Sequence, residues 1–439
     1  MNQQSDSEIE VGLGLSRKWN AREAGREVAD TAIRRLSRPP DFFLLFSTIH
    51  FEKDGGFQEF LNGVWDVLPK GTPLVGGTVV GFMNNHGCYT RGASGLAVSS
   101  SQMDVVLGCG RNVKRNPKRA AQQSISMIKK GLATSPYKNK FLLNLVSGPE
   151  LMKIPGQGYK KVIDSGFISS FATLTFGMSQ YLLQKGLGRE DEIFEEMVKK
   201  LPEYHMILGT SMDDYKGMSN YQFFNETILT NAVVNLGLAT NLDLNVCTTH
   251  GMKETDKKFT ITKLSKDRHI IHEINHRPAV PELLRLLEWP NGFLNEKTMA
   301  HTMPYYPISL QRQGRDIPIV MPAILKNSIM TPCKIDDGNV VILTVSGRDL
   351  VSAMKENLSS FEGMQPAFGL CSTCMTILAT LGHNMDLVRS ELLSYFKEQP
   401  FLMILCAGEG TYAPNRPLTY ANMSYNTAIF GRENNQISK

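Results

Sequence analysis

The sequence predicts an α+β protein with α/β-like layers, in which two modules with mixed β-sheets pack together beneath outer helices. Three observations support this fold class. Short apolar runs at residues 41–47, 140–147 and 401–406 are typical of strands buried on both faces. Amphipathic helical stretches separate such runs, and the connecting loops are short. The composition, with 42% hydrophobic and 20% charged residues, is that of a globular protein.

The first half of the chain alternates between predicted strands and helices. Residues 17–36 carry alanine, valine and leucine at spacings of three and four, which predicts a helix that ends before Pro39 and Pro40. Residues 227–242 are apolar, but their pattern does not distinguish helix from strand. The other predicted elements, in order, are strand 10–15, strand 41–47, helix 57–68, strands 72–78, 93–99 and 105–108, helix 117–132, strand 140–147, a mostly helical stretch at 160–201 and strand 206–211.

The second half begins with a predicted hairpin. Residues 258–274 alternate between apolar and polar positions on both sides of the turn Ser265–Arg268. Residues 288–318 contain four prolines, which predicts an irregular linker or domain seam. The remaining predicted elements are helix 278–287, strand 340–345, helix 348–358, strand 367–371, helix 387–397 and strand 401–406. We see no internal repeat at a fixed period.

Charge and cysteine content predict a cytoplasmic protein. The polar, acidic start at residues 1–10 predicts no signal peptide, and no apolar run reaches about 18 residues, so no membrane span is expected. Seven scattered cysteines are typical of reduced thiols. The net charge of +5 is small, and the basic run at 111–119 is interpreted first as a solvated loop and helix start. We therefore expect no nucleic-acid partner.

Glu409 is the sharpest candidate for a binding residue. It follows the apolar run 401–406 and lies between Gly408 and Gly410, which allow close approach of a ligand. A carboxylate there suits a cation such as an α-ammonium group, although a structural Glu bound to backbone amides remains open. Asn422 and Ser424 lie two apart on a predicted strand, so they share a face and either contact a ligand or tie down the loop.

Two further loops carry candidate ligand-binding residues. Asp213 and Asp214 follow a strand that ends in Gly-Thr-Ser, where aspartates more often form turns than bind ligands. Gly76, Gly77 and Thr78 end a buried strand, and their backbone amides either cradle a carboxylate or simply form the turn. No lysine follows at the spacing of a phosphate-binding loop, which argues against a nucleotide site of that kind.

Six groups of segments, in order along the chain, match the pattern of a known family. They are Val11–Gly14, Pro40–Phe46, Pro73–Thr78 with Gly81, Gly209–Asp214, Phe259–Lys263 with Glu273–Ala279, and Gly408–Glu409 with Asn422–Ser424. In these segments the chain resembles the FIST (F-box and intracellular signal transduction) family, with both its N-terminal and C-terminal domains. On this resemblance, residues 10–240 form the N-terminal module, with a helical insertion near 162–201, and residues 241–431 form the C-terminal module. The resemblance implies a sensory and signal-transduction role.

The sequence departs from the family pattern at several positions. Thr210 stands where the family has a second glycine, and Ala421 stands where a histidine is common. Many members carry an arginine in the stretch that aligns with residues 373–377, and this chain has none there. If that arginine holds an anionic group of the ligand, this protein binds something else or nothing.

Other motifs give weaker predictions. His272–His276 spells H-E-x-x-H, but a predicted strand would hold the two histidines about 13 Å apart, so we expect no zinc site. Cys371 and Cys374 form a lone C-x-x-C and are expected to be buried small hydrophobes. Some FIST proteins are similar to haem-binding nitric-oxide sensors, for which His250 and His301 are the candidate axial ligands.

The sequence leads to one principal hypothesis and two alternatives. The principal hypothesis is a non-catalytic sensor without a cofactor. It binds a small polar ligand, for example an amino acid, in a pocket between the modules and signals to a separate output protein. The alternatives are a module that recruits client proteins and a haem-based gas sensor. An enzyme is disfavoured because no nucleophile, base and orienting acid come together in the sequence. The sequence leaves a homodimer open.

Overall fold

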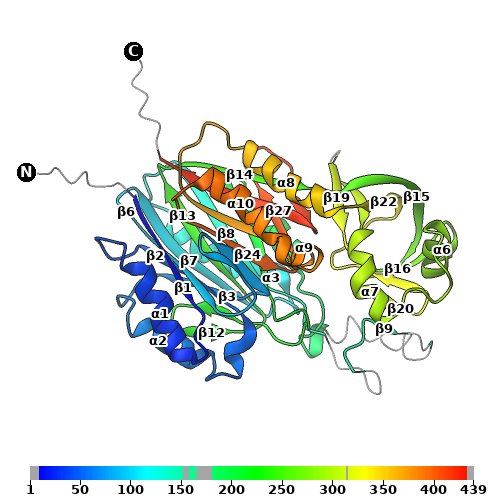
Figure 1. Ribbon diagram of the computed structural model, residues 1–439, viewed down its shortest axis with the longest axis horizontal. Helices are drawn as coiled ribbons and strands as arrows, with labels where there is room; N and C mark the ends of the chain where they lie inside the picture. The colour runs from blue at the N-terminus through cyan, green and yellow to red at the C-terminus, as the bar shows by residue number, and fades with distance from the viewer. Residues whose placement is uncertain (1–8, 152–157, 164–165, 167–179, 313–314, 433–439) are drawn as a thin grey trace, which may run out of the picture.

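The computed structural model describes residues 9–151, 158–163, 166, 180–312 and 315–432. Figure 1 shows a large body with several β-sheets and, on the right, a smaller lobe between β14 and α8 in the chain. Mixed sheets covered by outer helices confirm the predicted fold class.

Three six-stranded sheets of the body have the same strand order. Each contains an antiparallel pair, then two parallel central strands, and then an antiparallel hairpin. Sheet 1 consists of β1 (Ile9–Ser16), β6 (Ala93–Ser100), β2 (Phe42–Ser47), β3 (Leu74–Thr78), β11 (Gln222–Phe224) and β12 (Thr227–Leu229). Sheet 2 consists of β7 (Met103–Arg111), β13 (Ala232–Thr240), β8 (Asn139–Ser147), β10 (Tyr204–Ser211), β25 (Glu409–Tyr412) and β26 (Thr419–Ala421). Sheet 3 consists of β14 (Asp243–His250), β27 (Ser424–Gly431), β23 (Pro366–Cys374), β24 (Phe401–Cys406), β4 (Gly81–Asn84) and β5 (Gly87–Tyr89).

The three sheets exchange their hairpins in a cycle. The first four strands of each sheet come from one stretch of chain, 9–100, 103–240 or 243–431, and the hairpin comes from another stretch. The hairpin β4–β5 of the first stretch pairs with β24, the hairpin β11–β12 of the second stretch pairs with β3, and the hairpin β25–β26 of the third stretch pairs with β10. The fold is therefore a structural repeat, which the sequence analysis did not find because insertions make the three stretches unequal in length.

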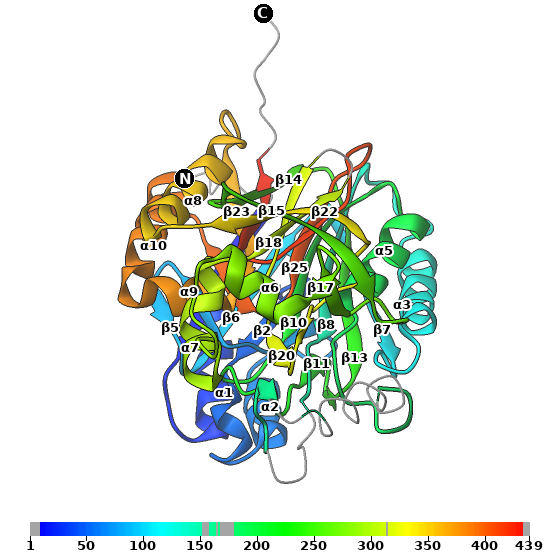
Figure 2. The ribbon, with the colours of Figure 1, turned by 90° about the vertical axis from the view of Figure 1, so that its right-hand side faces the viewer.

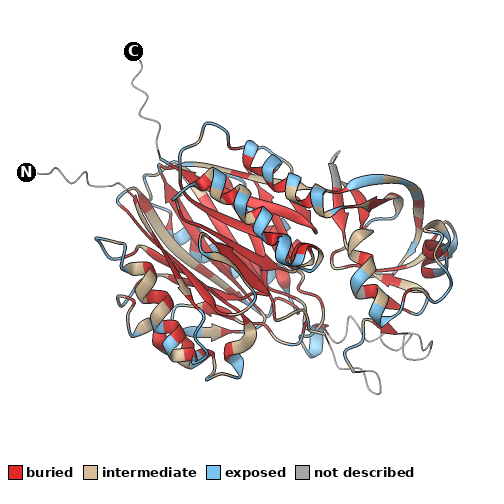
Figure 3. Ribbon diagram, viewed as in Figure 1, coloured by how far each residue is buried: buried red, intermediate tan, exposed pale blue. Residues whose placement is uncertain are grey.

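Alternation along the central strands divides the core between the two faces of each sheet. In β2, Phe42, Leu44 and Phe46 face a core shared by all three sheets, and Phe43 and Leu45 face the helices. The run 401–406 divides in the same way, which confirms a strand buried on both faces. Figure 3 shows buried residues filling the sheets while the helices carry exposed residues on their outer faces.

Each sheet has its own set of covering helices. Sheet 1 packs against α1 (Ala21–Ile33) and α2 (Phe57–Trp65), with the short 3₁₀ turn η1 (Ile49–Glu52) nearby. Sheet 2 packs against α3 (Pro117–Gly131) and α5 (Glu190–Lys200). Sheet 3 packs against α8 (Gly347–Ser359), α9 (Met375–Leu381) and α10 (Met385–Phe396), with η3 (Gly382–Asn384) between the last two.

The small lobe is an insertion in the third stretch (Figure 2). It enters through β15 (Lys253–Leu264) and leaves through its neighbour β22 (Gly338–Thr344). Its other elements are β16 (Ile270–Ile274), β17 (Arg277–Pro278), α6 (Ala279–Leu286), α7 (Glu296–Thr302), η2 (Met303–Tyr305), β18 (Ile308–Arg312), β19 (Arg315–Ile319), β20 (Ala323–Leu325) and β21 (Ser328–Met330). Strand β9 (Val162–Ile163) adds to β20.

Several sequence predictions can be compared with these elements. The hairpin at 258–274 is confirmed as β15 and β16. The prediction of an irregular linker at 288–318 is wrong, because this stretch contains α7, η2, β18 and part of β19. A capping box at Asn295 stabilises the first turn of α7, so a helix forms there despite the nearby prolines. The ambiguous stretch 227–242 forms β12 and β13. The predicted helical insertion near 162–201 contains β9 and α5, whereas residues 164–165 and 167–179 lie outside the described residues.

Candidate ligand-binding site

The parallel strands of the three sheets end in matching pairs of small polar residues. Polar groups at the carboxyl ends of parallel strands are a common setting for binding sites. The paired residues, all buried, are Ser47 with Thr78, Ser147 with Ser211, and Cys374 with Cys406.

The loops that follow these strands meet at one centre through a cycle of hydrogen bonds. Met212 N donates to Thr78 O over 2.8 Å, and Val80 N donates to Leu405 O over 3.1 Å. Ala407 N donates to Thr210 Oγ1 over 2.9 Å. The three predicted loops, near Thr78, Asp213 and Glu409, are therefore neighbours although they are far apart in the sequence.

At the first loop, the two glycines are required by packing. A Cβ on Gly76 would lie 1.7 Å from the carbonyl oxygen of Leu45, and a Cβ on Gly77 would lie 2.5 Å from that of Tyr221. The amide of Thr78 donates to Tyr221 O over 2.9 Å, and Thr78 Oγ1 accepts from Tyr221 N over 3.0 Å. Thr78 thus holds Tyr221 in place, and its amide is not available to cradle a carboxylate.

At the second loop, the two aspartates differ in role. Asp213 is buried, and its carboxylate accepts from the amides of Gly217 over 2.8 Å and Met218 over 2.6 Å. Asp214 is half-buried and pairs with the exposed Lys216 at 2.6 Å. Asp213 therefore shapes the turn that positions Met218.

At the third loop, Glu409 is fully buried. One carboxyl oxygen accepts long hydrogen bonds from Ser424 N at 3.4 Å and Ser424 Oγ at 3.5 Å, and the other has no hydrogen-bond partner among the residues described. Burial, with a smaller contribution from Glu190, raises the pKa of Glu409 well above its ordinary value. Burial therefore favours the uncharged form of this carboxyl group, which disfavours the negative charge expected for binding an ammonium group.

Asn422 ties the lobe to the body. Its side-chain oxygen accepts from Val320 N over 3.2 Å, and its backbone amide donates to Pro318 O over 2.8 Å. Its side-chain amide donates to Ala407 O at 3.5 Å. These contacts correspond to the loop-holding role that the sequence left open for this residue.

Glu190, which the sequence analysis did not select, is a second buried carboxyl group near the third loop. It accepts from the hydroxyl of Tyr420 over 3.0 Å. Its oxygens occupy space left by two glycines, since a Cβ on Gly188 or Gly408 would lie 2.3 Å or 2.4 Å from them. Burial first, and then the charge of Asp191, raise the pKa of Glu190 to about 7.

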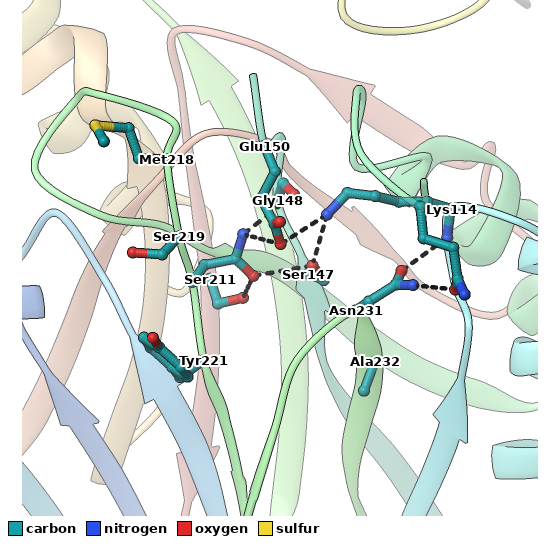
Figure 4. A network of polar contacts seen from close by, with 12 residues as sticks. Lys114, Ser147, Gly148, Glu150, Ser211, Met218, Ser219, Tyr221, Asn231 and Ala232 are labelled. Carbon is teal, nitrogen blue, oxygen red and sulfur yellow. Dashed lines mark hydrogen bonds and ion pairs between the residues drawn. The ribbon is translucent and has the colours of Figure 1, made fainter. Parts of the chain in front are cut away.

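A polar network centred on Lys114 lies at the ends of the sheet 2 strands (Figure 4). The ammonium group of Lys114 is fully buried and donates to Glu150 Oε1 at 3.0 Å and to Ser147 Oγ at 3.3 Å. Ser147 and Ser211 both donate to Asn220 Oδ1, over 2.9 and 3.0 Å. Burial lowers the pKa of Lys114, and the charge of Glu150 opposes this shift.

The backbone around the network positions its members. Ser147 and Ser211 are the last residues of β8 and β10, so strand pairing sets them side by side. The side chain of Asn231 accepts from Lys114 N over 3.0 Å, which fixes the loop between β7 and α3. The backbone of Glu150 pairs with Gly186 through two hydrogen bonds of 2.8 Å.

This network borders a cleft of 460 Å³, which we call the polar cleft. Figure 4 shows Glu150, Met218, Ser219, Tyr221 and Asn231 around the network. The residues that line the cleft are Asn112, Glu150, Leu183, Gln184, Lys185, Met218, Ser219, Asn220, Tyr221, Thr230 and Asn231. Thr78 and Asp213 do not line the cleft, but they hydrogen-bond to two residues that do, Tyr221 and Met218 respectively. Glu409, Asn422 and Ser424 do not line it.

The central residues of the Lys114 network were missed for an identifiable reason. Lys114 lies in the basic run 111–119, which was interpreted as a solvated loop. Glu150 and Asn220 lie in loops without a recognised motif. The available signal was that strands 140–147 and 206–211 both end in serine, and parallel strands bring such ends together.

The sequence motifs related to metal binding and membrane insertion can also be compared with the described residues. No group of three or more His, Cys, Asp or Glu side chains there is arranged to hold a metal ion. His272 and Glu273 lie on strand β16, as predicted, and not on a helix. None of the described helices is both long and apolar enough to cross a membrane.

Comparison with known proteins identifies the family. A family model described as the FIST N domain matches residues 41–277. The chain belongs to the FIST family. FIST is a signal-transduction sensor family, which agrees with the resemblance stated above for the N-terminal module. The C-terminal FIST module stays a prediction.

Other comparisons add little about function. None of the curated proteins matches the sequence. A crystal structure of a cyanuric acid hydrolase from A. caulinodans aligns over 97% of this chain and 99% of its own chain, with 8% identity and a TM-score of 0.36. A TM-score this low carries no argument about this FIST protein.

Proposed function

We propose that this FIST protein is a non-catalytic sensor that binds a small polar ligand, for example an amino acid, in the polar cleft. The observation that carries the proposal is the buried Lys114–Glu150 ion pair beneath a cleft lined mostly by amide, hydroxyl and charged side chains. A cleft of 460 Å³ is within the usual range for small-molecule sites.

The ligand's charged groups have complementary partners in the polar cleft. The side chain of Glu150 is 14% exposed and offers a carboxylate to an ammonium group. Lys185 is exposed at the rim and offers a cation to a carboxylate. Asn220 and Asn231 supply donors and acceptors that orient the ligand. All these residues lie within 1–240, so we propose this site in place of the pocket predicted between the modules.

Ligand binding would be transmitted through the cleft's rim. Residues 183–185 and 218–219 line the cleft from loops, and exposed Tyr181 and Leu182 directly precede the first of these loops. A ligand that orders this loop would change the surface offered to a separate signalling partner. All seven cysteines are free, which supports a reducing, cytoplasmic location.

A thermal-shift screen of amino acids and other polar metabolites tests the proposal. We expect at least one compound to raise the melting temperature of the wild type and to lose this effect in Glu150→Gln. Glu254→Gln is the matched control, because Glu254 is exposed on the lobe strand β15 and does not line the cleft. Compounds that stabilise wild type and Glu150→Gln equally, or a screen without any stabilising compound, would contradict it.

A haem-based gas sensor is the second candidate, favoured by the position of His301. This residue lines a separate cavity of 460 Å³ between the lobe and α9, whose walls include Met299, Met303, Met321 and Met375. One histidine in a largely apolar cavity fits an axial ligand to haem. A Soret band in the purified protein that disappears in His301→Ala would support this candidate, and its absence after haem addition would exclude it.

A further inference from the structure

A second charged cleft spans the seam between the lobe and sheet 2, and we call it the basic cleft. It has a volume of 450 Å³ and is distinct from the polar cleft. The turn between β15 and β16 and Lys334 line it from the lobe, and the loop before α3 and the start of α5 line it from the body. Its cationic lining residues are Lys114, Arg115, Arg189, Lys266, Arg268 and Lys334.

The cations of the basic cleft outnumber its carboxylates. Among the residues that the structure describes, Glu192 and Asp267 are the two carboxylates in its lining. Glu192 is shared by Arg189 at 2.6 Å and Lys334 at 2.7 Å. Outside the lining, Glu150 pairs with Lys114 and Asp336 pairs with Arg268.

Two exposed cations remain after this pairing. Arg115 and Lys266 have no ion-pair partner within the part of the chain that the structure describes. Arg115 comes from the body, where its Nε donates to Tyr181 O over 2.8 Å, and Lys266 comes from the lobe, so like charges from both parts line one cleft. An anion bound in the cleft would offset the charge of both.

We propose that the basic cleft binds a small phosphorylated metabolite. A phosphate group suits the planar guanidinium of Arg115 and the ammonium groups of Lys266 and Lys334, because several donors can share its oxygens. The ring of Tyr181 lies 5.1 Å from the guanidinium carbon of Arg115, and Tyr181 is 59% exposed. It offers a flat face to an unsaturated ring in the same ligand.

The dimensions of the site argue for a small molecule and against a nucleic acid. A cleft of 450 Å³ is of the size that small ligands occupy. Nucleic acids bind along extended basic grooves with successive stacking residues. The ligand would contact both the body and the lobe, so its binding would hold the two parts together. This inference is independent of the ligand proposed for the polar cleft.

Isothermal titration calorimetry of the full-length protein with pyrophosphate and with AMP tests the inference. Adenosine serves as the uncharged probe, and Lys266→Gln and Arg115→Gln are the cleft variants. Lys355→Gln on α8 and Arg35→Gln after α1 are matched controls, since both residues are exposed and lie outside the cleft. Circular dichroism checks that each variant folds.

We expect AMP or pyrophosphate to bind the wild type and both controls, with at least tenfold weaker binding to each cleft variant. Binding should weaken as salt rises from about 50 to 200 mM, because exposed charges are screened. The inference is overturned if neither phosphate compound binds, if the cleft variants bind as the wild type does, or if adenosine binds equally well. It is also overturned if a 20-nucleotide single strand binds at the cleft and AMP does not.

Discussion

Replacing Lys114 by methionine should destabilise the protein strongly, because it removes one partner of a buried ion pair. The side chain of Lys114 is fully buried and that of Glu150 is 14% exposed. After the change, the side chain of Glu150 keeps a hydrogen bond of 3.4 Å from Asn220. Breaking a buried pair costs about 3–5 kcal/mol, and the partial exposure of Glu150 favours the lower end, about 3 kcal/mol.

Urea denaturation measures this cost. With a slope of about 3 kcal/mol per M, the midpoint should fall by roughly 1 M in Lys114→Met. The double variant Lys114→Met with Glu150→Gln carries no unpaired charge and should recover about two thirds of the loss. Lys355→Met on the exposed face of α8 should stay within about 0.5 kcal/mol of the wild type.

Two results would refute this reasoning. A fall of less than about 0.3 M in Lys114→Met would mean that Glu150 is solvated well enough without its partner. A double variant as unstable as the single one would mean that the packing of the lysine side chain, and not its charge, stabilises the site.

Three further predictions concern the neighbouring groups. The pKa of Glu190, raised to about 7 in the fold, lies above its unfolded value of about 4.5, so stability is lost as pH rises between these values. Glu190→Gln should therefore gain about 2.5 kcal/mol more over wild type at pH 8 than at pH 5, measured by urea denaturation, and an equal gain at both pH values would contradict the raised pKa. The titratable groups near Glu190 are Asp191, Glu409, Tyr420 and Lys114. Gly408→Ala would place a Cβ 2.4 Å from Glu190 and should lower the melting temperature by several degrees, and a neutral effect would show that Glu190 moves freely. Asp213→Asn should speed amide hydrogen exchange at Gly217 and Met218 by about tenfold or more, and unchanged exchange would exclude its role in holding that turn.

The sequence was most informative where a local pattern decides the structure. The run 401–406 has no polar residue, so it could only be stable as a strand covered on both faces, and it is one. The hairpin of β15 and β16 follows from alternation and its polar turn. Such features depend on neighbours in the chain, which the sequence displays directly.

Features that depend on distant partners were not predictable in the same way. Nothing near Gly81 indicates that its hairpin pairs with β24, more than 300 residues away. Lys114 resembles its basic neighbours in sequence, and only the arrival of Glu150 and Ser147 from another strand end makes it a buried ion-pair partner. The charge of Glu409 likewise depends on burial and on Glu190, which lies in another part of the chain.

The same limits apply to the candidate site. Thr78 and Asp213 were predicted to bind a ligand directly, whereas in the structure they hydrogen-bond to Tyr221 and Met218, which line the polar cleft. Whether any of the predicted residues contacts a ligand stays a prediction.

The most direct test of the central claim is a crystal structure of the protein with the polar metabolite that raises its melting temperature most. We predict ligand density in the polar cleft, with an ammonium or other donor group within hydrogen-bond distance of the Glu150 carboxylate. Density in the methionine-lined cavity or on another surface, or the absence of any stabilising metabolite to crystallise, would contradict the claim that this cleft is the sensor site.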